Sequence, residues 1–82
     1  MFLEDFEGGA MEKFKISLKA ARVNANMTQE QVAKAVHRNK QTIVNWEKGF
    51  TQIKVNDLLA LSELYGIPVE YLEIPKRRKE DS

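Results

Sequence analysis

Residues 27–49 read MTQEQVAKAVHRNKQTIVNWEKG, and this stretch decides the fold. Thr28 is followed three residues later by Gln31, which is the spacing of a capping box and predicts that a helix begins here. The apolar residues that follow are small and recur at helical spacing, so this helix can approach its neighbours closely. Its predicted inward stripe is Val32, Ala33 and Val36.

A second helix is predicted after a short turn at His37 and Arg38. Asn39 is a good N-cap, residues 40–48 read KQTIVNWEK, and Gly49 suits the position just beyond a helix. Two helices joined by such a turn form a helix-turn-helix, in which the second helix lies in the major groove of DNA.

The second helix has two different sides. We expect Ile43, Trp46 and Glu47 to hold it to the domain. Trp46 is assigned to the core rather than to stacking on bases, because it shares a face with Ile43. The other side is free for a partner, with a merely solvated polar face as the alternative. It consists of Lys40, Gln41, Val44 and Asn45.

Helical spacing continues on the N-terminal side of this stretch. A first helix is predicted from Lys13, and one face of it carries Phe14, Leu18, Ala21 and Arg22. It ends at residues 24–26, because asparagine favours turns and caps.

On the C-terminal side, residues 50–54 are expected to form a loop before a helix over Val55–Tyr65, which Gly66 closes. Pro68 then opens a short fifth helix over residues 69–73. No strand pattern is present. The predicted fold is therefore all-α, with five short helices around a central helix-turn-helix.

Size and composition fit one small domain that rests on apolar packing. The chain has 82 residues and no cysteine, which excludes disulfides, thiolate zinc sites and thiol nucleophiles. No apolar run approaches the roughly 18 residues of a membrane span, and the acidic N-terminus does not resemble a secretory signal. We therefore expect a cytoplasmic protein without a membrane partner.

Charge is unevenly distributed along the chain. The net charge is +1, yet residues 13–82 hold all 13 Lys and Arg residues and carry a balance of +5. A basic body suits a polyanionic partner. Residues 1–12 are expected to be a flexible acidic leader, or an arm that covers the basic surface, and Met11 is an alternative translation start. Residues 13–74 form the predicted domain, and residues 75–82 form a polar tail.

The central stretch resembles the helix-turn-helix of the phage repressor and Cro family, also called the Xre family. The shared features are TQEQVA at residues 28–33, Thr42-Ile43, and WEKG at residues 46–49. The later run LLALSELYGIPVEYL resembles the helices that complete the five-helix, lambda-repressor-like domain of this family. The chain departs from the family pattern at His37, where glycine is common, and at Ile53, where proline is common.

The resemblance implies that Lys40, Gln41 and Asn45 occupy base-contacting positions. Lysine can donate to guanine O6 and N7, and Gln or Asn can pair with adenine. Val44 lies on the same face, where an apolar group can meet a thymine methyl.

Phosphate contacts are implied at the edges of the motif. Thr28 and Gln29 match positions at the start of the first motif helix, although Thr28 also serves as a cap. Thr42 is expected to be structural or to touch a phosphate. The remaining candidates follow the recognition helix, where a charge can also simply be solvated. They are Lys48, Thr51, Gln52 and Lys54.

Arg22 and Glu47 each lie on an otherwise apolar face, which is unfavourable without a partner. The resemblance implies an ion pair between them, with a structural role. Catalytic and metal constellations are missing from the sequence, which has one histidine, no cysteine and no clustered acids. We expect no enzyme activity, no cofactor, no metal and no small-molecule ligand.

The resemblance implies a phage or bacterial transcriptional regulator, expected to be a repressor. It would bind double-stranded DNA as a homodimer on near-palindromic half-sites about one helical turn apart. The alternatives are an antitoxin that represses its own operon, with a toxin as partner, and a protein-interaction module that keeps the fold without binding DNA. The expected dimer surface lies near the fifth helix and the tail. It consists of Ile67, Val69, Tyr71, Leu72 and Ile74.

Overall fold

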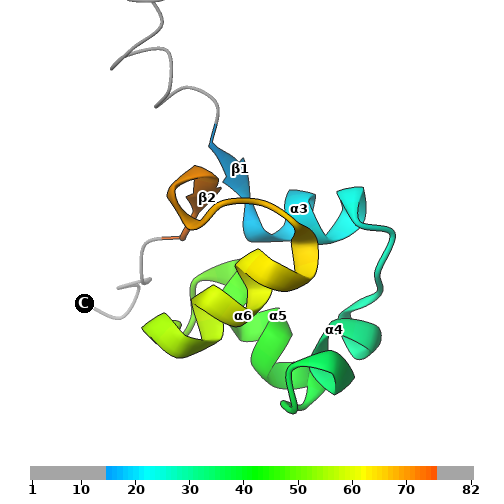
Figure 1. Ribbon diagram of the computed structural model, residues 1–82. Helices are drawn as coiled ribbons and strands as arrows, with labels where there is room; N and C mark the ends of the chain where they lie inside the picture. The colour runs from blue at the N-terminus through cyan, green and yellow to red at the C-terminus, as the bar shows by residue number, and fades with distance from the viewer. Residues whose placement is uncertain (1–14, 76–82) are drawn as a thin grey trace, which may run out of the picture.

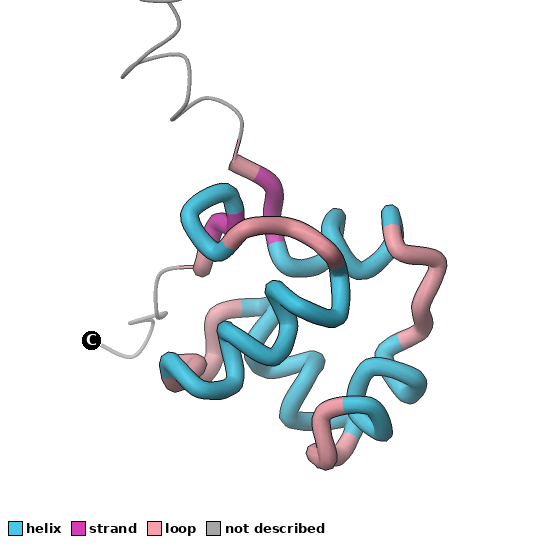
Figure 2. Tube along the Cα trace, in the orientation of Figure 1, coloured by secondary structure: helices cyan, strands magenta, loops and turns pink. Residues whose placement is uncertain are grey.

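The computed structural model describes residues 15–75. Four α-helices make up most of this part, as Figure 2 shows. Labels follow Figure 1, in which the helices are α3 (Leu18–Asn24), α4 (Gln29–Ala35), α5 (Lys40–Lys48) and α6 (Val55–Tyr65). The predicted leader over residues 1–12, the helix start at residues 13–14 and most of the tail lie outside the described residues.

The predicted helix-turn-helix is present as α4 and α5, which pack closely against each other. In the turn between them, the backbone N–H of Arg38 donates to the carbonyl of Ala33 at 2.8 Å. His37 stands at a φ of 61°, in the left-handed region that glycine adopts more readily. The chain therefore makes the tight turn without the glycine that is common there.

The helix α3 begins later than the sequence predicted. Its N-cap is Ser17, whose hydroxyl oxygen accepts a hydrogen bond from the backbone N–H of Ala20 at 3.0 Å. Residues Ile16 and Ser17 are extended and form strand β1 (Ile16–Ser17). The helical spacing of the side chains was read correctly from Leu18 onwards, but it does not reveal where the backbone turns extended.

The predicted fifth helix is wrong as a full helix. After Pro68 there is a single 3-10 turn, η1 (Val69–Tyr71), and the chain then extends as strand β2 (Leu72–Glu73). The reason is tertiary, because Leu72 is only 3% exposed and fills the core. The described residues therefore contain four α-helices rather than five.

The expectation of no strands is also wrong. Strands β1 and β2 pair in parallel, with Ile16 opposite Leu72 and Ser17 opposite Glu73. Figure 1 shows this pair at the upper left, where the first and last described segments lie side by side. Strands of two residues are too short to show the alternating pattern that predicts a strand.

The core lies between the four helices. Trp46 is 5% exposed, in keeping with its assignment to the core, and Ile53 is 8% exposed, so it anchors the loop between α5 and α6. Val55, the first residue of α6, is 70% exposed and lies outside the core. The buried apolar residues are Leu18, Ala21, Val32, Ala33, Ile43, Trp46, Ile53, Leu61, Tyr65 and Leu72.

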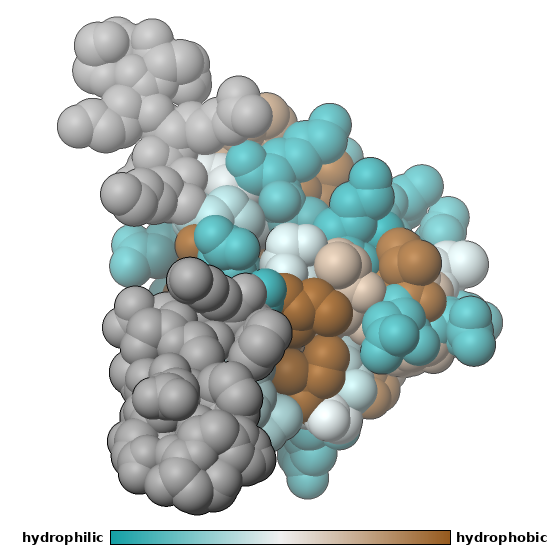
Figure 3. Space-filling view, turned by 90° about the horizontal axis from the view of Figure 1, so that it is seen from above, coloured by the Kyte–Doolittle hydropathy of each residue, from teal (hydrophilic) through white to brown (hydrophobic). Residues whose placement is uncertain are grey.

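Figure 3 looks down on the molecule of Figure 1, and in this view hydrophobic residues form several patches, the most prominent near the centre, among hydrophilic residues.

Candidate nucleic-acid interface

Local signals fix the length of α5 at both ends. The side-chain oxygen of Asn39 accepts from the backbone N–H and from the hydroxyl of Thr42, each at 2.9 Å. At the other end, Gly49 has a φ of 79°, and the N–H of Phe50 donates to the carbonyl of Asn45 at 2.9 Å. Thr42 therefore takes part in capping, and its hydroxyl proton is donated to Asn39.

The outward side of α5 carries the four residues that the sequence analysis placed there. Lys40 and Gln41 are exposed, while Val44 and Asn45 are half-buried. Lys40 and Val44 lie one helical turn apart, and so do Gln41 and Asn45, so the four residues share one side of the helix. The Gln41 amide donates to the side-chain oxygen of Asn45 at 3.1 Å, which aligns the two amides with each other.

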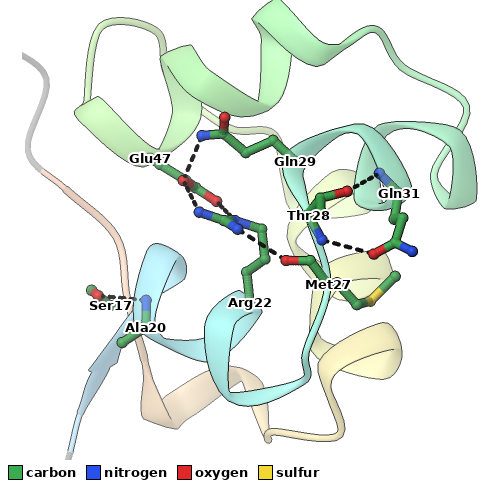
Figure 4. Close-up of polar contacts among 8 residues, drawn as sticks. All are labelled: Ser17, Ala20, Arg22, Met27, Thr28, Gln29, Gln31 and Glu47. Carbon is green, nitrogen blue, oxygen red and sulfur yellow. Dashed lines mark hydrogen bonds and ion pairs between the residues drawn. The ribbon is translucent and has the colours of Figure 1, made fainter.

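A buried ion pair joins α3 to the end of α5 (Figure 4). Nε of Arg22 donates to Oε2 of Glu47 at 2.7 Å, and Nη2 donates to Oε1 at 3.3 Å. Only 11% of the Arg22 side chain and 5% of the Glu47 side chain are exposed. Nη1 of Arg22 also donates to the carbonyl of Met27 at 2.9 Å. The hydrogen bond with Glu47 raises the pKa of Arg22 despite its burial.

Gln29 is drawn into this ion pair. Its Nε2 donates to Oε1 of Glu47 at 3.0 Å, which links the start of α4 to the end of α5 (Figure 4). The sequence predicts Gln29 only as a phosphate contact and gives no signal for this link. A glutamine amide has two N–H donors, so one remains for another acceptor.

The start of α4 has the predicted capping box. The hydroxyl oxygen of Thr28 accepts from the backbone N–H of Gln31 at 3.0 Å, and the Gln31 side chain accepts from the N–H of Thr28 at 2.8 Å. Thr28 is exposed beyond this cap.

The four candidates at and after the end of α5 are all exposed. Nζ of Lys48 lies 5.9 Å from the centroid of the Phe50 ring, within the range of a cation–π contact. These residues continue the outward side of α5 along the chain. They are Lys48, Thr51, Gln52 and Lys54.

Two further ion pairs were missed by the sequence analysis. Nζ of Lys40 lies 3.3 Å from Oε2 of Glu30, and 53% and 67% of these side chains are exposed. Hydrogen bonds from the Glu30 backbone and from Lys40 lower the pKa of the Glu30 carboxyl. Arg38, in the turn, contacts Asp57 of α6 at 3.0 Å. One pair joins α4 to α5 and the other joins the turn to α6, so spacing along one helix gives no signal for them.

Tyr65 lies near the buried ion pair. It is 8% exposed, and its hydroxyl has no hydrogen-bond partner among residues 15–75. Burial, with a smaller contribution from the charge of Glu47, raises the pKa of Tyr65 to about 12, while Arg22 opposes the shift.

Residues 15–75 contain no group of three or more His, Cys, Asp or Glu side chains that could hold a metal ion. No helix in the same range is long and apolar enough to cross a membrane.

Comparison with known proteins matches residues 18–72 to a protein family described as helix-turn-helix. The HTH-type transcriptional regulator ImmR of Bacillus subtilis (strain 168) is 31% identical over 68 residues, which cover 78% of this chain and 54% of that protein. The cryptic phage CTXphi transcriptional repressor RstR of Vibrio cholerae is 30% identical over 59 residues, which cover 72% of this chain and 53% of that protein. The chain thus spans about half the length of these relatives. No solved structure matches it.

Proposed function

The chain belongs to the helix-turn-helix family, and from this we propose that it is a sequence-specific DNA-binding transcriptional regulator of the cytoplasm. We propose further that it is a repressor, which occupies an operator as a dimer. The observation that carries the proposal is the division of α5 into a buried side and an outward side with aligned amides. One similar protein is a transcriptional regulator and the other is a transcriptional repressor, and both support this proposed function.

Base reading is assigned to the outward side of α5. The amides of Gln41 and Asn45 suit adenine, which offers a donor and an acceptor in the major groove. Lys40 suits the two acceptors of guanine, and Val44 suits a thymine methyl. The buried side supports this role, because a helix locked by packing and capping presents its outward groups in a fixed orientation.

Phosphate contacts are assigned to the exposed polar groups around α5, where they would fix the register on DNA without reading sequence. The second amide N–H of Gln29 is free to donate to a phosphate while the first stays on Glu47. The other exposed members of this group are Thr28, Lys48, Thr51, Gln52 and Lys54. Thr42 is half-buried and both of its donors are on Asn39, so it keeps the structural role.

Two exposed apolar surfaces are candidates for the dimer contact: the one first expected, where Leu72 is buried but Ile74 is 43% exposed, and the outer side of α6. Val55 and Leu59 lie one turn apart on α6 and are 70% and 51% exposed. Two antiparallel copies of α6 centred on Leu59 would pack the exposed Leu59 side chains of the two chains against each other. Such a contact is self-complementary, as a two-fold dimer requires.

Selection of bound sequences from random duplex DNA tests this function. We expect a near-palindromic consensus from the wild-type chain, and the Gln41→Ala and Asn45→Ala variants should each lose preference at one or two positions of every half-site. Asn24→Ala, which removes an exposed amide on α3, is the matched control and should keep the consensus. An unchanged consensus in both variants would refute the assigned reading residues, and a consensus without two-fold symmetry would refute the dimer.

Salt dependence separates the regulator from a protein-interaction module with the same fold. Binding to the selected DNA should weaken with salt, with a log–log slope of about −0.9 for each phosphate neutralised. A chain that binds no duplex in a salt-dependent manner would rule out the regulator. An antitoxin would bind its operator in the same way and in addition form a stable complex with a toxin.

A further inference from the structure

An exposed acid stands at the edge of the proposed DNA interface. Residues 28–48, which hold the helix-turn-helix, contain two acids, Glu30 and Glu47. Glu47 is buried against Arg22, whereas 67% of the Glu30 side chain is exposed. A carboxylate beside a phosphate backbone repels it, so Glu30 weakens the electrostatic attraction on which non-specific binding depends.

The carboxylate of Glu30 is held next to Lys40, the first residue of α5. Its Oε2 lies 3.3 Å from Nζ of Lys40, and hydrogen bonds from the Glu30 backbone and from Lys40 lower the pKa of this carboxyl. Two other cations near the proposed interface, Lys48 and Lys54, form no ion pair within residues 15–75. Among Lys40, Lys48 and Lys54, only Lys40 has a carboxylate beside its ammonium group within the described residues.

This difference matters because phosphate and guanine attract a lysine in different ways. Phosphate attraction follows net charge and is present on every DNA sequence, whereas guanine offers two acceptors at one fixed place. A lysine paired with a carboxylate loses much of its pull on phosphates. It can still donate a second and third N–H to guanine while one N–H stays on the carboxylate, because an ammonium group has three donors.

We propose that Glu30 is a specificity-determining residue, which restrains Lys40 so that this lysine adds affinity chiefly where a guanine lies beneath it. Glu30 acts through Lys40 and is a positioning residue rather than a base contact. The inference rests on the proposed function, since it assumes that α5 reads DNA.

The test compares wild-type chain with Glu30→Gln, which keeps the shape of the side chain and removes its charge. Affinity is measured for the selected operator and for a duplex of unrelated sequence, each over a range of salt concentrations. On the unrelated duplex, Glu30→Gln should bind about threefold to fivefold more tightly, with a salt slope steeper by about 0.9, because Lys40 is released to one further phosphate. Affinity for the operator should change less than twofold, so discrimination falls.

Two controls test whether the effect comes from the pair of Glu30 and Lys40. Glu70→Gln removes an exposed acid on η1 and makes the same change in net charge, and it should leave discrimination unaltered. In a Lys40→Gln background, adding Glu30→Gln should no longer steepen the slope. Circular dichroism should report the same helix content in each variant.

Three results would overturn the inference. They are an equal gain on both duplexes, an effect of Glu70→Gln as large as that of Glu30→Gln, and an undiminished effect in the absence of Lys40. Each leaves the DNA-binding function standing. Loss of the function itself has a different signature, namely a wild-type chain that binds neither duplex in a salt-dependent way.

Discussion

The two ends of α5 carry ion pairs of opposite character. At its C-terminal end, Glu47 holds Arg22 at 2.7 Å, with 5% and 11% of these side chains exposed. At its N-terminal end, Lys40 faces Glu30 at 3.3 Å, with 53% and 67% exposed. The buried pair is reinforced by hydrogen bonds from Gln29 and to a backbone carbonyl, whereas the exposed pair has water as its main competitor.

The difference shows how burial decides what an ion pair does. A buried charge that loses its partner is left without water, so the pair behaves as a fixed joint between helices. An exposed pair contributes little to stability, because water competes for both charges. One end of α5 is thus fixed to the domain, and the other end carries a charge pair that faces solvent.

The largest effect is expected from breaking the buried pair. Glu47→Ala should lower the free energy of unfolding by about 3–5 kcal/mol, because the guanidinium of Arg22 stays buried without a carboxylate. Urea denaturation followed by circular dichroism measures the loss. A Glu47→Ala variant that is already unfolded in buffer would also agree with the prediction. Glu47→Gln, which keeps an acceptor oxygen, should lose less. A loss below about 1 kcal/mol for Glu47→Ala would contradict the comparison.

A second prediction concerns stability at alkaline pH, which depends on Tyr65 near the pair of Arg22 and Glu47. The pKa of Tyr65 is raised to about 12, so the folded chain favours the neutral phenol. Neutral Tyr65 therefore stabilises the folded chain fully below the ordinary tyrosine pKa of about 10. This stabilisation is lost as pH rises from about 10 through 12, because Tyr65 ionises first in the unfolded chain. Stability measured by urea denaturation should therefore fall over this range. Tyr65→Phe should reduce that fall, and an identical pH profile in the variant would contradict the assignment.

The smallest loss of stability is expected from breaking the ion pair between Arg38 and Asp57, which is more exposed than the pair between Arg22 and Glu47. Arg38 and Asp57 are 3.0 Å apart, with 48% and 13% of their side chains exposed. Arg38→Gln should lower the free energy of unfolding by about 0.5–1 kcal/mol, well below the loss for Glu47→Ala. Thermal and urea unfolding in low and high salt measure it, and the effect should shrink in high salt. A loss as large as that of Glu47→Ala would mean that burial does not govern these pairs.

The sequence predicted those features that depend on neighbours in the chain. The bounds of α5 follow from Asn39 and Gly49, and the start of α4 follows from Thr28 and Gln31, because capping acts within one helical turn. The two sides of α5 were likewise readable from its period. The helical period identifies the outward side only as a polar surface. Its expected role in binding DNA came from the family resemblance.

Features that depend on contacts between distant segments could not be predicted. The pairing of Ile16 with Leu72 turned a predicted helix into a short strand, because burial of one leucine outweighed helical propensity. Gln29 and Glu30 face partners on α5, 18 and 10 positions away in the chain, and no spacing rule connects them. The candidate site was therefore predicted as a set of outward residues but not as a network.

The strand pair has a consequence for how this domain joins other polypeptide. Because β1 and β2 are bonded side by side, the domain receives and releases its chain at one edge, which lies across the molecule from α4 in Figure 1. Polypeptide joined directly before β1 and polypeptide joined directly after β2 would therefore both meet the domain at the strand pair. Two tethers placed there would share a single hinge point, and tension applied through them would load the strand pair before it reached the helices.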